Sequence, residues 1–124
     1  GYDGALNIER LTDHFVHSLE LSRPVDLGRK FDWVLSLEVG EHIPAQYEDI
    51  FLDNLIRHAD KGIILSWAIP GQQGLSHVNL HPNEYIISKM KGKGLTHDAV
   101  SEIILRNHTT IGYFMKTVMV FRKQ

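Results

Sequence analysis

Residues Phe31 to Pro44 read FDWVLSLEVGEHIP, and this stretch decides how the rest of the chain is interpreted. An apolar run from Trp33 to Leu35 gives way to charged residues and ends at a proline. Short apolar runs bounded by turn signals predict buried strands, and ligands of open α/β sheets bind just beyond the carboxyl ends of strands. The stretch therefore predicts a strand over Phe31–Leu37 and a functional site where it ends. The polar side chains that follow this strand are Glu38, Glu41 and His42.

The segments that follow alternate between helix and strand patterns. Pro44 suits the first turn of a helix, and an apolar stripe of helical spacing continues to His58, with Gly62 as the expected stop. A continuous apolar run over Ile63–Ile69 predicts a buried strand, which Pro70 and Gly71 end. Asn83–Lys91 is expected to be a short helix. The alternating, β-branched pattern of Tyr113–Phe121 predicts a final strand.

The remaining segments give weaker patterns. Gly1–Gly4 (GYDG) has the composition of a tight turn. We expect a short helix within Ala5–Thr12, a short strand over Phe15–Leu21 and a brief strand over Leu95–His97. Asp98 can cap a helix that extends to Arg106. Strands that alternate with helices predict an α/β fold with a mostly parallel sheet.

Composition narrows the class of protein. The chain has 124 residues, which suffices for one domain and one core, and we expect a single domain over residues 1–124. A formal net charge of −2 gives no electrostatic argument for binding nucleic acid or an anionic membrane. The absence of cysteine excludes disulfides and thiolate metal sites. No apolar run approaches the roughly 18 residues of a membrane span, and a cytoplasmic protein is expected.

The block from Phe31 to Ile43 resembles the fourth strand, and the turn after it, of class I S-adenosylmethionine-dependent methyltransferases. That family commonly carries FDxVxxxEVxEHI at this place, and this chain carries FDWVLSLEVGEHI. Ile64–Ala68 is similar to the fifth strand of the family and Tyr113–Arg122 to its last. The resemblance implies a Rossmann-like sheet, mostly parallel with an antiparallel last strand, and S-adenosylmethionine as the cofactor.

The resemblance also implies which residues bind this cofactor. Gly1–Gly4 is similar to the end of the second strand, whose acid, here Asp3, accepts both ribose hydroxyls. A carboxylate can take two hydrogen bonds from a cis-diol. Leu19-Glu20-Leu21 is similar to a turn near the adenine amino group, although many members have Asp where this chain has Glu20. The implied cofactor-binding residues are Asp3, Gly4, Glu20, Leu21, Leu37 and Glu38.

The chain departs from the family in one respect. A glycine-rich turn of the type DxGxGxG, together with the first strand, should precede GYDG, and neither is present in the sequence. In the family this turn lets the backbone approach the methionine part of the cofactor. We therefore interpret residues 1–124 as an N-terminally truncated, C-terminal part of a methyltransferase. Phe31–Leu37 is then expected to lack a neighbour on one side. Residues 14–21 could move into this gap, or two chains could pair through the exposed edge, unless the missing strand is present in the protein.

Two histidines are candidates for a general base, because imidazole titrates near neutrality. His42 lies in the block itself, and His77 lies in the polar loop 71–82, where the family commonly builds its substrate wall. Glu38, Glu41 and His42 also form a possible magnesium site. Methyltransferases of RNA 3′ ends and some ubiquinone-pathway O-methyltransferases look similar here and hold such an ion with this block. A fourth ligand would come from His77 or His81, and the other histidines are expected at the surface.

Three functions follow as hypotheses. The first is methyl transfer from S-adenosylmethionine to an unidentified acceptor, with a small molecule more compatible than nucleic acid with the acidic balance. The second is a non-catalytic fragment or interaction module of the same fold that binds no cofactor, which the missing glycine-rich turn favours. The third is a metal-dependent methyltransferase that uses the cluster at residues 38–42. The sequence does not identify the acceptor.

Overall fold

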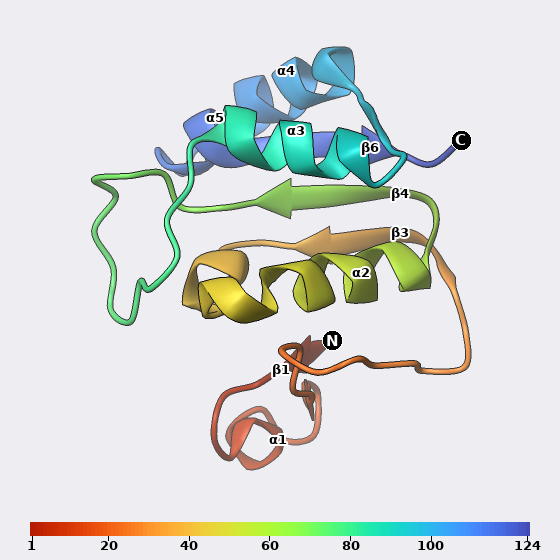
Figure 1. The fold of residues 1–124 in the computed structure, drawn as a ribbon. Coiled ribbons are helices and arrows are strands. Elements are labelled where there is room, and N and C mark those ends of the chain that lie inside the picture. The colour runs from red at the N-terminus through yellow and green to blue at the C-terminus, as the bar shows by residue number, and fades with distance from the viewer.

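The computed structural model describes residues 1–124, as a main sheet with helices packed on it and a small unit beside it (Figure 1). The main sheet has the order β3-β4-β6-β5. Its strands are β3 (Phe31–Ser36), β4 (Ala59–Ser66), β6 (Val118–Arg122) and β5 (Thr96–His97). β3 is parallel to β4, whereas β6 is antiparallel to both β4 and β5. Three strands therefore run one way and the last strand opposes them, which confirms the predicted α/β fold.

The core lies between this sheet and two helices, α2 (Glu48–His58) and α3 (Asn83–Gly92). The two helices lie side by side, and Lys93, the residue that caps the end of α3, forms ion pairs with Asp49 and Asp53 of α2. A third helix, α4 (Ala99–His108), packs along β6, and Asp98 caps it by accepting a hydrogen bond from the amide of Ser101, as predicted. The most deeply buried large side chains are Trp67, Phe51, Phe121, Leu52, Ile63 and Leu65. No helix has the length and apolar character needed to cross a membrane.

Residues 1–20 form a separate unit next to the sheet (Figure 1). In it β1 (Tyr2–Asp3) pairs in parallel with β2 (His17–Ser18), and a one-turn helix, α1 (Ile8–Leu11), lies between them. Neither strand pairs with the main sheet, so β3 has β4 as its one neighbour. The prediction that this strand has one unpaired edge is therefore confirmed.

Several predicted boundaries are wrong. Tyr113–Phe121 is not one strand, because its first half forms the short helix α5 (Phe114–Thr117), in which the Thr117 hydroxyl donates to the carbonyl of Tyr113. The strand predicted over Ile63–Ile69 is shifted, since β4 begins at Ala59 and ends at Ser66. GYDG is not a tight turn, because Tyr2 and Asp3 belong to β1.

Gly62 does not stop a helix. α2 ends at His58, and Gly62 lies inside β4, where the ring of Trp33 covers it. A Cβ atom at Gly62 would come within 2.5 Å of that ring and of the Phe121 carbonyl oxygen. The glycine is thus required by close packing across the sheet.

Two of the histidines expected at the surface are not exposed. His58 is buried, and its ring accepts a hydrogen bond from the Leu27 amide through Nε2 while Nδ1 contacts the Asn54 carbonyl. His97 is half-buried and pairs with the buried carboxylate of Glu102. Both rings have polar partners, which offset the free-energy cost of burying them. One partner of His58, the Leu27 amide, is distant in the sequence, so a local pattern could not reveal this burial.

Candidate functional site

The polar turn after β3 and the loop after β4 meet at one edge of the sheet. β3 and β4 point their carboxyl ends to the same side, from which the loop extends (Figure 1). The turn contains the 3₁₀ segment η1 (Gly40–His42), and a second one, η2 (Ala45–Tyr47), leads into α2. The amides of Val78 and Asn79 donate to the Glu41 carbonyl at 2.9 and 3.0 Å. Loop 71–82 therefore lies against this turn, as expected.

Glu38 is held in an unusual backbone conformation at the start of the turn. Its φ angle is +54°, in the left-handed region that costs energy for a residue with a side chain. Ser66 stabilises it twice, by accepting from the Glu38 amide at 2.9 Å and by donating to Oε2 at 3.0 Å. The Gln72 amide group donates to Oε1. Both oxygens of the Glu38 carboxylate are therefore hydrogen-bonded, one to Ser66 of β4 and the other to Gln72 of the loop.

Glu41 is the least satisfied polar side chain of the turn. It is 0% exposed, and neither carboxylate oxygen has a hydrogen-bond partner. Burial raises the pKa of the Glu41 carboxyl, the Glu38 carboxylate adds to the rise, and His42 and nearby backbone amides oppose it only in part. An unpaired buried carboxylate is costly, so a proton or a cation is expected to accompany it.

Two imidazole rings face this carboxylate. The Nδ1 atom of His42 contacts the Ser76 carbonyl at 3.0 Å, and that of His77 contacts the Gln72 carbonyl at 3.1 Å. A carbonyl at Nδ1 favours the proton on that nitrogen and leaves the lone pair on Nε2. The ring centroids are 5.1 Å apart, and one ligand atom from each of Glu41, His42 and His77 lies within 4.8 Å of the others.

The set of metal-ligating residues predicted from the sequence differs from the cluster in the structure at one member. Glu38 is turned toward Ser66 and Gln72, and His77 takes its place in the cluster. His81, the other candidate for a fourth ligand, pairs instead with the buried carboxylate of Glu48 at 2.9 Å. Spacing within five residues could not show which of these side chains turn inward.

Trp67 is a residue of this site that the sequence did not single out. Its ring is fully buried and lies against Gly40, where an added Cβ would come within 2.1 Å of the indole. Its Nε1 donates to the Asn79 carbonyl at 2.7 Å. Trp67 therefore links the turn after β3 to loop 71–82. The apolar run that contains it gave no sign of this polar contact.

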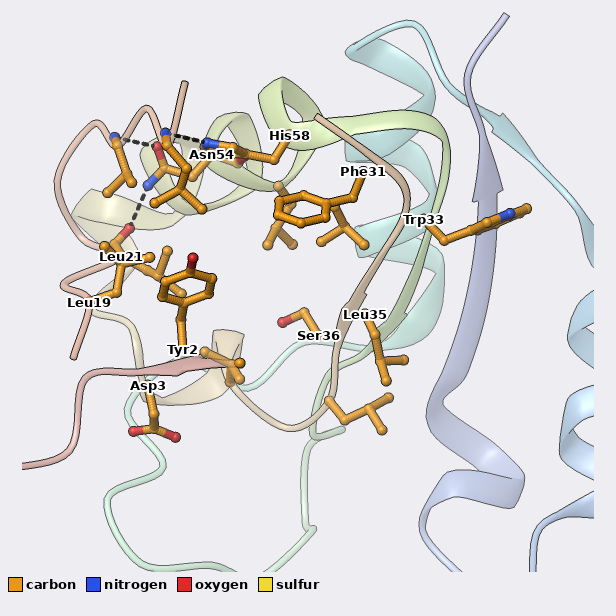
Figure 2. A pocket seen from close by; sticks show the side chains of 17 residues that line it. Tyr2, Asp3, Leu19, Leu21, Phe31, Trp33, Leu35, Ser36, Asn54 and His58 are labelled. Carbon is orange, nitrogen blue, oxygen red and sulfur yellow. Dashed lines mark hydrogen bonds between the residues drawn. The ribbon is translucent and has the colours of Figure 1, made fainter. Parts of the chain in front are cut away.

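A cavity of about 480 Å³ opens between β1 and β3 (Figure 2). Its wall is mostly apolar and is built from β1, the segment 19–27, β3 and α2. Of the residues predicted to bind the cofactor, Asp3, Leu21 and Leu37 line it. One oxygen of the exposed Asp3 carboxylate accepts from the Ala5 amide at 2.7 Å.

The other predicted cofactor-binding residues do not line this cavity. Gly4 lies beyond it. Glu20 turns back on its own chain, where hydrogen bonds from the hydroxyl and amide of Ser22 lower the pKa of its carboxyl. Glu38 belongs to the neighbouring turn described above. The cavity therefore contains part of the predicted set.

Asn54 fixes the cavity wall, although the sequence placed it on a helix without a role. It is 1% exposed, and its oxygen accepts from the Val25 amide at 2.8 Å while its amide donates to the carbonyl of Leu21 (Figure 2). The same amide also donates to the carbonyl of Arg23. Leu21 is thereby held against the core. A buried asparagine with three backbone partners in one segment fixes the position of that segment.

Comparison with known proteins supports the fold. No family model matches the sequence, and no curated protein matches it significantly. Among solved structures, the magnesium protoporphyrin IX methyltransferase of Synechocystis PCC 6803, with SAH bound, matches with a TM-score of 0.62. The chain has the fold of a class I methyltransferase. The match covers 88% of this chain at 19% identity and 51% of that chain, so residues 1–124 span about half its length.

Proposed function

We propose that the protein takes part in methyl transfer from S-adenosylmethionine and that the rim of the gap between β1 and β3, at the carboxyl ends of these strands where Asp3 and Leu37 lie, binds the nucleoside part of this cofactor. The observation that carries the proposal is the meeting of Asp3, Leu21 and Leu37 around one cavity in this fold. In that arrangement Asp3 accepts the ribose hydroxyls, while Leu21 and Leu37 contact the adenine ring. A carboxylate beside apolar side chains at this rim suits a purine nucleoside, whereas the apolar residues deeper in the gap, such as Phe31 and Val34, face the place of the family's first strand.

The cofactor supplies an electrophilic methyl group on a sulfonium centre when it is bound. Asp3, Leu21 and Leu37 would hold the cofactor, whose methyl group would pass to an oxygen or nitrogen of the acceptor. His42 or His77 takes the proton that the acceptor loses, since each ring has an Nε2 lone pair free of protein partners. The protein contributes positioning of the two reactants in line.

Calorimetric titration with S-adenosylhomocysteine tests the proposal. We expect saturable binding to the wild-type chain and roughly 5- to 150-fold weaker binding to Asp3→Ala, about 1–3 kcal/mol, because ribose hydroxyls would lose their acceptor. Asp60→Ala, which changes an exposed acid of β4 away from the cavity, is the matched control. An affinity that is the same in all three proteins would remove Asp3 from the site. Absence of any binding would favour the non-catalytic module of the same fold.

A metal-dependent form of this activity is the second candidate. The observation that favours it is the buried Glu41 carboxylate without hydrogen-bond partners, next to two imidazoles whose Nδ1 atoms are occupied by carbonyls. One carboxylate and two imidazoles suit Mn²⁺ or Zn²⁺ better than Mg²⁺, which prefers oxygen ligands. Glu41, His42 and His77 would hold the ion, which would polarise an acceptor oxygen and lower its pKa.

Metal titrations test this candidate separately. We expect Mn²⁺ and Zn²⁺ to bind the wild-type chain in calorimetry and to bind Glu41→Gln and His77→Ala at least tenfold more weakly. His108→Ala is the control, because this exposed histidine lies in α4 with no acidic partner. Unchanged affinity in Glu41→Gln, with the fold verified by circular dichroism, would contradict the metal site.

A further inference from the structure

A second cavity, of about 410 Å³, opens where the chain leaves β4 and where it approaches β6. Two short segments line it, one from Ile69 to Gln72 and the other from Gly112 to Thr117. Its wall is mixed, with polar and apolar surface in similar shares, whereas the cavity between β1 and β3 is mostly apolar. A volume of this size is within the range of small-molecule sites.

Gln72 connects this cavity to the turn after β3. Its amide nitrogen donates to the strained Glu38, while its oxygen is shielded from solvent and has no hydrogen-bond partner. An unsatisfied buried acceptor costs about 1–3 kcal/mol, so a donor that reaches it is favoured. Gln72 lines the cavity, and its oxygen, which lies just beneath the surface, is an acceptor that the protein itself does not use.

Lys116 gives the same cavity a positive charge. Its backbone is fixed, because its carbonyl accepts from the Asn83 side chain at 2.6 Å, while its ammonium group forms no ion pair. Gly71 and Gly112, one from each segment, are exposed where they line the cavity. A free cation beside an open cavity favours an anionic ligand.

We propose that this cavity binds the methyl acceptor, and that the acceptor is a small molecule with an anionic group and a hydroxyl or amino donor. The anionic group, a carboxylate or a phosphate, pairs with Lys116, and the donor is directed toward Gln72. This inference rests on the proposed methyl transfer, because Gln72 joins the cavity to Glu38 at the carboxyl end of β3.

Nuclear magnetic resonance titration of the ¹⁵N-labelled chain tests the inference with defined probes. The probes are 3-hydroxybenzoate, 3-hydroxyphenyl phosphate and the neutral 3-hydroxybenzamide. We expect one or both anions to shift the amide signals of residues 69–72 and 112–117, and the neutral amide to bind at least fivefold more weakly. The anion that binds more tightly identifies the acidic group.

Variants decide whether the charge of Lys116 is responsible. Lys116→Gln is expected to weaken binding of the better anion at least fivefold, whereas Lys91→Gln, an exposed lysine of α3 without an ion pair, leaves it unchanged. Equal affinity for the anions and the amide, or no shifts at these residues with any probe, would overturn the inference. Anion binding without binding of S-adenosylhomocysteine would keep the cavity as an anion site and contradict the methyl transfer instead.

Discussion

Gly40 lies where the backbone passes directly against an indole ring. An added Cβ would come within 2.1 Å of the buried Trp67 ring, which cannot move because its Nε1 is bonded to the Asn79 carbonyl. We expect Gly40→Ala to lower the free energy of unfolding by about 1–3 kcal/mol, the usual cost of overpacking a core. Urea denaturation followed by tryptophan fluorescence measures this change.

Gly92→Ala is the matched control for this prediction. Gly92 ends α3, and an added Cβ there would meet nothing within 4 Å. Alanine is favoured over glycine in a helix by up to about 1 kcal/mol, so this variant should be as stable as the wild type or slightly more stable. Equal stability of the two variants would show that the Trp67 ring can shift to make room for a side chain at residue 40.

At the residue scale the sequence predicted part of the site for a physical reason. The strand and the polar residues after it are local features, so Glu38, Glu41 and His42 could be identified from their order along the chain. Which of them turns inward depends on Ser66 and Gln72, which occupy the Glu38 carboxylate and leave Glu41 to the two histidines. Those contacts join residues 28 or more positions apart, and local pattern does not encode them.

Between elements, α2 is joined to α3 and to loop 71–82 through one carboxylate. Glu48 is 3% exposed and accepts from Lys89 at 2.6 Å and Tyr85 at 2.9 Å, and His81 of the loop lies 2.9 Å from it. Burial tends to raise the pKa of Glu48, but the bonds from Lys89 and Tyr85 outweigh it and lower the pKa below its ordinary value of 4.5.

We expect Glu48→Gln to reduce the free energy of unfolding by about 2 kcal/mol at pH 7, because hydrogen bonds to a charged group are lost from a buried site. A carboxyl with a depressed pKa in the folded state stabilises the protein above its unfolded pKa. That contribution is lost as the pH falls through the folded pKa. The difference between the wild type and Glu48→Gln should therefore shrink below about pH 4.5, the ordinary carboxyl value.

Denaturation of both proteins at several pH values measures this difference. Glu84→Gln is the control, since Glu84 is an exposed acid in the first turn of α3 and has no ion pair. A difference that is independent of pH would mean that Glu48 acts through packing rather than charge.

The elements themselves were predictable to different degrees. The apolar stripe of α2 and the Asp98 cap of α4 are local signals, and both helices are present where these signals place them. The sequence did not separate α5 from β6, because apolar residues such as Phe114 and Met115 also fit a strand. In the structure, the Thr117 hydroxyl donates a hydrogen bond to the Tyr113 carbonyl, and this bond stabilises a helical turn rather than a strand.

For the whole molecule, the unpaired edge of β3 is the surface most suited to association. β3 pairs with β4 alone, and Leu35, on this edge strand, is 64% exposed. The small unit of β1 and β2 stands apart from the edge, and the edge itself, including Leu35, lines the mostly apolar cavity between them, so chain pairing at this edge and cofactor binding there would compete (Figure 2). An exposed apolar edge strand is a template for pairing with another chain.

Substitution of Leu35 by lysine tests this property, because a charged side chain on an edge strand disfavours pairing. We expect the wild type to show a sedimentation coefficient that rises with protein concentration, and Leu35→Lys to raise the dissociation constant of the associated form at least tenfold. The free energy of unfolding should change little, since Leu35 is mostly exposed. Leu6→Lys introduces the same charge at a residue that is 86% exposed in the small unit, away from β3, and is expected to behave as the wild type. If Leu6→Lys prevents association and Leu35→Lys does not, the contact belongs to the small unit rather than to the sheet edge.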